Sequence, residues 1–201
     1  MNKYILSLGI FALIISIYQA LALKQAHFYS LFSIGMFIIL LFIYNKVFKK
    51  ELFLKWSKTK IILFFLTLTL ICIFIDKIGM FLNYWDYPSY TTFFDEILKY
   101  LFEWVAPFMY ITLSFMIGIE IFRKFKFSKK ISIILSFIIF GILIGFITDT
   151  INMGVSSWRI TNMPITNLKL GSYFIIFSTI GYWLMIGITY ITYKLFNNYK
   201  K

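Results

Sequence analysis

The sequence predicts an all-α integral membrane protein with six transmembrane helices, and three observations lead to this fold class. Of its 201 residues, 61% are hydrophobic and the mean hydropathy is +0.84, whereas soluble domains are usually about 45–50% apolar. Several uncharged runs approach the roughly 20 residues that cross about 30 Å of hydrocarbon. The connections between these runs alternate between rich and poor in Lys and Arg.

Six apolar runs are candidate spans. They cover residues 4–23, 28–44, 61–75, 100–122, 131–148 and 171–196. The third run is short, and it reaches full length only if the helix continues through residues 78–82. We therefore expect one polytopic domain over residues 1–201, with a leading hairpin and basic connection (1–60) followed by two helix pairs (61–130 and 131–201).

The basic residues predict the orientation of these spans. The connection after the second run holds six lysines, and the one after the fourth holds Arg123 and four lysines. Fifteen of the 20 Lys and Arg residues fall on that side of the membrane, counting the two termini. Because basic loops stay in the cytoplasm, we expect a cell-membrane protein with both termini cytoplasmic. The same distribution accounts for the net charge of +12, so no nucleic-acid partner is expected.

The first run has a second interpretation. Lys3, the apolar run and Ala20-Leu21-Ala22 together resemble a signal peptide with its cleavage site. A short turn joins this run directly to the next span, so we expect it to remain as the first helix. Cleavage would leave the orientation of the other spans unchanged.

A repeated motif divides the rest of the chain. Asp76-Lys-Ile-Gly-Met, with Trp85 nine residues after the aspartate, recurs as Asp149-Thr-Ile-Asn-Met with Trp158. The same offset of 73 residues carries the third span onto the fifth and the fourth onto the sixth. The sequence therefore predicts a leading hairpin followed by a duplicated helix–outer loop–helix unit.

Three carboxylates near the outer face are candidates for a catalytic acid or base: Asp76, Glu103 and Asp149. A carboxylate at the membrane boundary is costly unless it is hydrated or paired, so such residues often have a function. Two similar helix pairs around one core would bring Asp76 and Asp149 toward a common outer vestibule. The alternative is that each is a solvated aspartate at a helix end, followed by a tryptophan at the headgroup level.

The outer loops supply the candidate ligand-binding residues: Trp85, Tyr87, Trp158 and Arg159. The first loop is rich in aromatic residues, and Pro88 excludes Tyr87 from helical geometry. This loop is either a lid over a pocket or an anchor at the membrane interface. Arg159 could pair with an outer aspartate or an anionic ligand, or it could reach the lipid phosphates.

The fourth span contains unusual charges. Lys99 precedes Glu103 by four residues, a spacing that allows a pair along the helix, and Pro107 should bend the helix. A partly desolvated Glu103 could donate a proton or bind a ligand. Glu120 should pair with basic residues one turn later, and His27, the single histidine, should be exposed on the outer turn.

Several sequence motifs are absent. The chain has no phosphate-binding glycine loop, no H-E-x-x-H, no G-x-S-x-G and no set of Cys and His ligands. Cys72 is the only cysteine, lies in an apolar run and should be a small buried side chain. We expect no metal and no cofactor. Gly141 and Gly145 form a small-xxx-small pattern, which predicts close helix packing.

One stretch resembles a known family. The matching residues are Trp56, Asp76, Gly79, Trp85-Asp-Tyr87-Pro88, Tyr90-Thr-Thr92, Glu103-Trp104, Pro107-Phe108 and Glu120. Through them, residues 49–122 resemble the lycopene cyclase domain of carotenoid synthesis. The resemblance implies proton-initiated ring closure of a polyene, with carboxyl groups as acid and base. The family's P-x-E-[ED] signature is absent, and only Tyr100-Leu-Phe-Glu103 stands in its place.

Three functions remain open from the sequence. The first is a protein that binds or transports a small solute through an outer vestibule, similar in size and topology to the substrate-binding subunits of vitamin uptake transporters. The second is an intramembrane enzyme acting on an isoprenoid or a lipid, and the third is a membrane scaffold without a small-molecule site. The expected partners are the lipid bilayer and either other membrane subunits or further copies of the chain.

Overall fold

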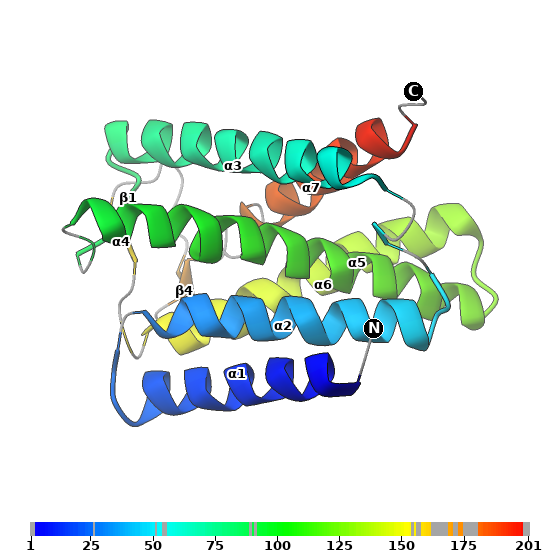
Figure 1. Cartoon of the computed structure of the whole chain (residues 1–201), viewed down its shortest axis with the longest axis horizontal. Helices are drawn as coiled ribbons and strands as arrows, with labels where there is room; N and C mark the ends of the chain where they lie inside the picture. Colours follow the sequence, from blue (N-terminus) through cyan, green and yellow to red (C-terminus); the bar gives the residue numbers. More distant parts are fainter. Residues whose placement is uncertain are drawn as a thin grey trace.

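Long helices make up most of the protein (Figure 1). The computed structural model describes residues 3–25, 27–50, 52–53, 56–88, 90, 92–153, 155, 158–161, 169–170, 173–174 and 181–198. The helices are α1 (Lys3–Leu21), α2 (Phe28–Lys46), α3 (Lys58–Phe81), α4 (Phe93–Leu98), the π-helix η1 (Lys99–Val105), α5 (Ala106–Lys124), α6 (Lys129–Met153) and α7 (Tyr182–Asn198). Four two-residue strands complete the described elements: β1 (Trp85–Asp86), β2 (Arg159–Ile160), β3 (Lys169–Leu170) and β4 (Tyr173–Phe174).

Five helices of the described chain are long and apolar enough to cross a membrane. They are α1, α2, α3, α6 and the continuous helix formed by α4, η1 and α5. Large apolar side chains point outward from them, as Leu66 and Phe74 do from α3, which suits a helix surrounded by lipid. The structure thus confirms the predicted all-α integral membrane protein.

Several helices extend beyond the predicted spans, the fourth from Phe93 to Lys124, and the sixth begins later than predicted. The third continues to Phe81, as its short apolar core required. The sixth was predicted to begin at residue 171, and this is wrong, because β4 lies at 173–174 and α7 begins at Tyr182. The strands β3 and β4 pair on either side of Gly171-Ser172, residue types that favour a two-residue hairpin. With 17 residues, α7 is about 26 Å long.

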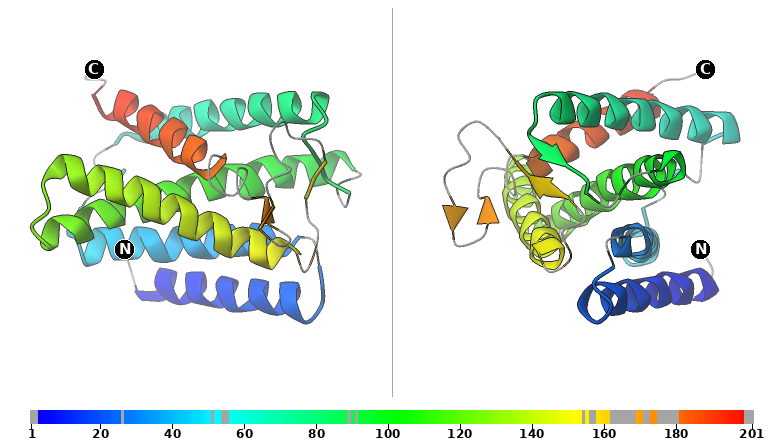
Figure 2. Two further views of the ribbon diagram at one scale, coloured as in Figure 1. Left: turned by 180° about the vertical axis from the view of Figure 1, so that it is seen from behind. Right: turned by 90° about the vertical axis from the view of Figure 1, so that its left-hand side faces the viewer.

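Helix α5 lies at the centre of the bundle. Every residue from Ala106 to Gly118 is buried, as expected of a helix that is apolar on all sides and packed on all sides. Helices α2, α6 and α7 contact α5, and α3 contacts η1. Helix α1 lies at the edge beside α2 (Figure 2), where Gly9 and Gly35 let the two backbones approach closely.

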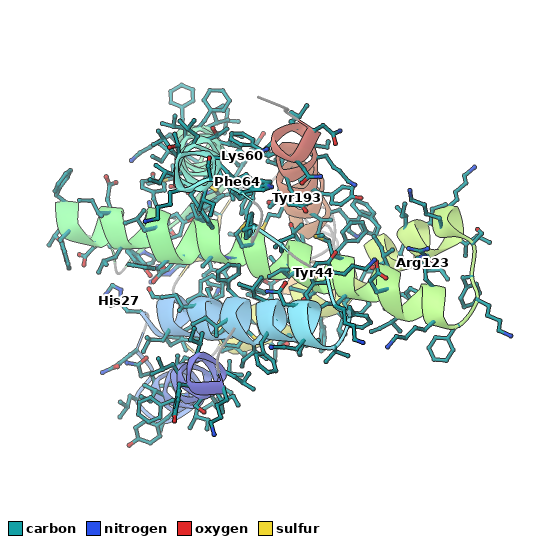
Figure 3. All side chains as sticks on the ribbon, turned by 45° about the vertical axis from the view of Figure 1, so that its right-hand side comes forward. His27, Tyr44, Lys60, Phe64, Arg123 and Tyr193 are labelled. Carbon is teal, nitrogen blue, oxygen red and sulfur yellow. The ribbon has the colours of Figure 1, made fainter. Side chains whose placement is uncertain are left out.

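The bundle has two chemically different ends. Both chain termini lie at one end, away from β1 (Figure 1). We call this the basic end, because the lysine-rich connections after α2 and α5 lie there, and the opposite end the sheet end. His27 lies at the sheet end and is exposed, as predicted, whereas Arg123 lies at the basic end (Figure 3). Glu120 pairs with Lys50 across the bundle at 3.5 Å rather than with its neighbours along the helix.

A short antiparallel ladder joins the two loops of the sheet end. Strand β1 pairs with β2, so that Trp85 lies opposite Ile160 and Asp86 lies opposite Arg159. The Thr161 amide extends the contact by donating to the Tyr84 carbonyl at 2.9 Å. Two loops that are far apart in the sequence thus form one cover at this end of the bundle.

Candidate ligand-binding pocket

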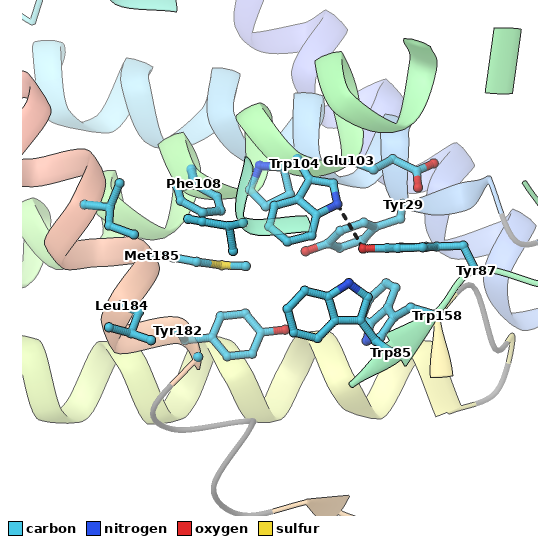
Figure 4. Close-up of a pocket in the computed structure, with 14 residues that line it drawn as sticks. Tyr29, Trp85, Tyr87, Glu103, Trp104, Phe108, Trp158, Tyr182, Leu184 and Met185 are labelled. Carbon is cyan, nitrogen blue, oxygen red and sulfur yellow. Dashed lines mark hydrogen bonds between the residues drawn. The ribbon is translucent and has the colours of Figure 1, made fainter. Parts of the chain in front are cut away.

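A cavity of about 290 Å³ lies beneath the sheet-end cover (Figure 4). Its walls come from α2, α3, η1, α5, α7 and the loops around β1 and β2. Seven aromatic residues line it: Tyr29, Trp85, Tyr87, Trp104, Phe108, Trp158 and Tyr182. The other lining residues are Ile75, Glu103, Pro107, Gly181, Leu184, Met185 and Ile188. The cavity is therefore apolar and aromatic, with Glu103 as the one acidic residue among its described lining residues.

Asp76 is buried next to this cavity and accepts from several groups at once. Its Oδ1 accepts hydrogen bonds from Trp85 Nε1 and Tyr87 OH, both at 2.9 Å. Its Oδ2 accepts from Tyr100 OH at 2.8 Å and forms an ion pair with Lys99 Nζ at 3.0 Å. These four partners satisfy the carboxylate, so Asp76 holds the aromatic rings in place and is not itself among the lining residues.

The local sequence explains how the first loop reaches Asp76. Helix α3 ends at Phe81, and Asn83, with φ of 56°, turns the chain back in the left-handed conformation that asparagine tolerates. The indole of Trp85 then lies on Gly79, where a Cβ atom would overlap the ring. The loop is thus folded onto α3, and the sequence interpretation of a lid over a pocket agrees with this geometry.

Tyr87 connects the Asp76 carboxylate to a second indole. Trp104 Nε1 donates to Tyr87 OH at 2.9 Å, while Tyr87 OH donates to Asp76. Burial and, second, the charge of Asp76 raise the pKa of the Tyr87 phenol well above its usual value, so that it remains a donor. The polar edges of three lining rings therefore point into this network, which leaves their carbon faces for the cavity.

The predicted pair between Lys99 and Glu103 is wrong. Lys99 is 1% exposed and pairs with Asp76 instead. Asp76 on the neighbouring helix α3 is the closer partner, and Lys99 is the first residue of the π-helix η1, whose hydrogen bonds join residue i to i+5. Lys99 also lies over the rings of Tyr87 and Tyr100, with Nζ 4.3 and 4.7 Å from their centroids. The seven-residue π-helix η1 ends at Val105, just before Pro107 in the first turn of α5.

Glu103 is the candidate carboxylate that lines the cavity itself. It is 7% exposed, and its Oε1 accepts from Ser30 Oγ at 2.7 Å. Its Oε2 accepts from Tyr90 OH, whose pKa is raised by burial and by the nearby Glu103 charge. No described Lys or Arg forms an ion pair with Glu103. The carboxyl is thus held by two hydroxyl groups, and the nearby His27 and Lys99 interact with it electrostatically without forming an ion pair.

Asp149 is also buried and also positions a lining ring. It is 8% exposed, and its Oδ1 accepts from Tyr182 OH at 3.2 Å. A neighbouring chain of hydroxyls, with 3.1 Å between successive oxygens, runs from Tyr29 through Tyr110 to Thr148. Asp76 and Asp149 therefore lie in the walls around one cavity, each behind an aromatic residue that lines it.

The two candidates in the second loop have different positions. Trp158 lines the cavity, with its ring 4.9 Å from that of Tyr29. Asn152 holds it, because its Nδ2 donates to the Trp158 carbonyl at 3.0 Å. Arg159 is exposed, faces Asp86 in the ladder and is not among the lining residues. The suggested pair between Arg159 and Asp76 is wrong, because Lys99 occupies that carboxylate.

Some pocket residues were not predicted as site residues. Tyr29 and Ser30 belong to the leading hairpin, which carried no motif, and Tyr182 lies in an ordinary apolar run. Lys99 and Trp104 were visible beside Glu103, but their roles depend on η1. Among the described residues, no group of three His, Cys, Asp or Glu side chains could hold a metal ion.

Comparison of the chain with protein-family models, with curated proteins and with solved structures found no match. The function of the cavity is therefore interpreted from its own geometry and chemistry.

Proposed function

We propose that this protein binds a small amphipathic solute in the aromatic pocket at its sheet end. The cavity volume of about 290 Å³ is close to the lower end of the range of small-molecule sites, about 300–1,000 Å³. Such sites are mostly apolar and contain a few polar groups that orient the ligand. Glu103 and the hydroxyls of Tyr29 and Tyr182 would supply these groups here.

The observation that carries this proposal is the Asp76 network. A carboxylate with four partners holds Trp85 and Tyr87 directly, and Trp104 through Tyr87. Rings held in this way lose little conformational entropy when a ligand binds, which favours affinity. A membrane scaffold without a ligand has no need of a positioned aromatic wall around an open cavity.

The proposed orientation puts the pocket in the outer half of the cell membrane. The lysine-rich connections after α2 and α5 lie at the end of the bundle that also holds both termini. Basic segments of this kind remain in the cytoplasm, so the sheet end would face outward. A protein that takes up the solute would need an energising partner, and that partner would meet the basic end.

We also propose that the two helix pairs arose by duplication. Helix α3, moved by 73 residues, would cover 131–154, and α6 is Lys129–Met153. In the ladder, Asp86 lies opposite Arg159, and these residues are also 73 positions apart. Equivalent residues lie opposite each other when a two-fold axis relates two units. The two copies of the motif would then form the pocket from two sides.

Native mass spectrometry tests the proposed function. The purified protein, in lipid nanodiscs, is exposed to a small-molecule extract of its native cells and then ejected intact. We expect a retained mass that is lost in Trp158→Leu and kept in the control Trp56→Leu, since Trp56 lies at the basic end against Tyr193. The absence of any retained mass, or equal retention by both variants, would favour the scaffold.

A second candidate is an intramembrane enzyme acting on an isoprenoid, and one observation favours it. Residues behind the lycopene cyclase resemblance lie around the cavity, including Trp85, Tyr87, Glu103, Trp104 and Pro107. Glu103 would be the acid, because Asp76 is occupied by four partners and Asp149 is not a lining residue. Expression should then alter the isoprenoid profile, and Glu103→Gln should abolish the change while Glu120→Gln preserves it.

A further inference from the structure

The charges around the pocket do not balance. Asp76 and Lys99 neutralise each other at 3.0 Å, and both are almost completely buried. Among the described residues, Glu103 accepts hydrogen bonds from the hydroxyls of Ser30 and Tyr90 alone, with Lys99 near it but paired to Asp76, although a carboxylate has about four acceptor sites. His27 contacts the Tyr90 ring and forms no ion pair with Glu103 in the described chain. A buried carboxylate is normally paired with a cation.

Three rings of the aromatic wall have their polar atoms engaged in the Asp76 network. Trp85 and Tyr87 direct their N–H and O–H groups to Asp76, and Trp104 directs its N–H to Tyr87. The face of an aromatic ring carries the negative part of its quadrupole. It therefore attracts a positive charge, and tryptophan does so most strongly. Three of the five tryptophans of the chain line this one cavity.

Other ligand charges fit this wall less well. An anion would be repelled by Glu103 and would find no available cation in the wall, because Lys99 is engaged and Arg159 lies outside. A neutral ligand would leave the Glu103 charge without a partner. We propose that the ligand is an organic cation, namely a small quaternary or protonated amine with apolar substituents. This inference rests on the proposed binding function and names its ligand class.

The arrangement of the lining residues suggests where the cation would lie in the cavity. Glu103 lies at one end of the labelled group with Tyr87, whereas Leu184 and Met185 lie at the other end (Figure 4). The ammonium group would lie near Glu103 and the rings of Tyr87 and Trp104. Its apolar substituents would extend toward Met185. The pocket would thus recognise charge at one end and apolar surface at the other.

The test compares two probes of the same shape. Choline carries a quaternary nitrogen, and 3,3-dimethylbutan-1-ol has a carbon atom in its place. Both are titrated into the protein in lipid nanodiscs by calorimetry and by tryptophan fluorescence. We expect choline to bind at least about tenfold more tightly, since desolvated cation–π contacts and a carboxylate both favour it.

Variants separate the charge from the shape of the pocket. Glu103→Gln keeps the size of the side chain and should reduce the ratio of choline affinity to neutral-alcohol affinity several-fold, leaving the part of the preference that the aromatic rings supply. Glu120→Gln, at the basic end beside Lys50, should behave as the wild type. Equal or tighter binding of the neutral alcohol by the wild type would overturn the cation class and leave the pocket as a binding site. If neither probe binds and the larger benzyltrimethylammonium does not bind either, the cation class is overturned. If the native mass spectrometry also shows no retained mass, the binding function is overturned as well.

Discussion

Replacing Lys99 by methionine removes the positive charge from the buried pair and keeps an unbranched apolar side chain in its place. Lys99 Nζ and Asp76 Oδ2 are 3.0 Å apart, and the two side chains are 1% and 0% exposed. In the variant, Asp76 retains its hydrogen bonds from Trp85, Tyr87 and Tyr100. It has no counter-charge, however, in a region that water does not reach.

The size of the effect follows from this burial. Removing one partner of a buried ion pair costs about 3–5 kcal/mol of unfolding free energy, because a charge is left uncompensated. The pair between Lys77 and Glu96 provides a matched control, since its distance is also 3.0 Å but its side chains are 50% and 41% exposed. Lys77→Met should therefore cost less than about 1 kcal/mol. The two lysines lie at the same end of the bundle and differ mainly in exposure.

A double variant isolates the uncompensated charge. Asp76→Asn combined with Lys99→Met removes both charges, so we expect it to be more stable than Lys99→Met alone by about 2 kcal/mol or more. Stability is measured by unfolding in mixed micelles with increasing SDS, followed by tryptophan fluorescence and far-UV circular dichroism. The reasoning is refuted if Lys99→Met costs no more than Lys77→Met, or if the two single effects simply add.

Three further predictions follow from single contacts and one pKa. Gly79→Ala should lower the unfolding free energy by about 1–3 kcal/mol, because the added Cβ overlaps the packed Trp85 indole. Gly187→Ala is the control and should be neutral or stabilising, because no atom lies within 4 Å of its added Cβ. Equal effects of the two variants in the same SDS titration would contradict this prediction. Tyr182→Phe should lower the unfolding free energy by about 1 kcal/mol, since it removes the hydrogen bond to Asp149. An unchanged midpoint of the SDS unfolding curve would count against that hydrogen bond. The raised pKa of Tyr87 means that the folded protein keeps a proton that the unfolded chain loses near pH 10, so this contribution to stability should fall as the pH rises above about 10. Tyr87→Phe should reduce that dependence, and an identical pH profile would show that the phenol does not titrate differently on unfolding.

The helices were largely predictable because hydropathy and length are properties of each segment alone. The extension of α3 to Phe81 followed from the requirement for a full span. The error at the start of α7 arose because the apolar residues of β4 were counted with those of the helix. Hydropathy measures burial in lipid, and it cannot separate a short strand pair from the first turns of a helix.

The candidate site was predictable in part of its membership but not in its pairing. The repeat and the predicted outer loops placed Asp76, Trp85, Tyr87 and Trp158 at one end of the bundle, and the structure puts them in or beside one cavity. The partner of Lys99 was wrong because spacing along one helix does not reveal a carboxylate on a neighbouring helix, here Asp76 of α3. Tyr29 was missed because its place in the wall depends on tertiary packing of the leading hairpin.

The claim that the sheet-end cavity binds a small solute is tested most directly by fluorine NMR of the protein labelled with 5-fluorotryptophan. The chain has five tryptophans, of which Trp85, Trp104 and Trp158 line the cavity. Resonances are assigned with single Trp→Phe variants, and choline or 3,3-dimethylbutan-1-ol is added in separate titrations. A bound solute should shift these three resonances and leave those of Trp56 and Trp183 in place. Shifts confined to Trp56 and Trp183 would contradict the proposed site, and so would the absence of a saturable shift both with these probes and with a small-molecule extract of native cells.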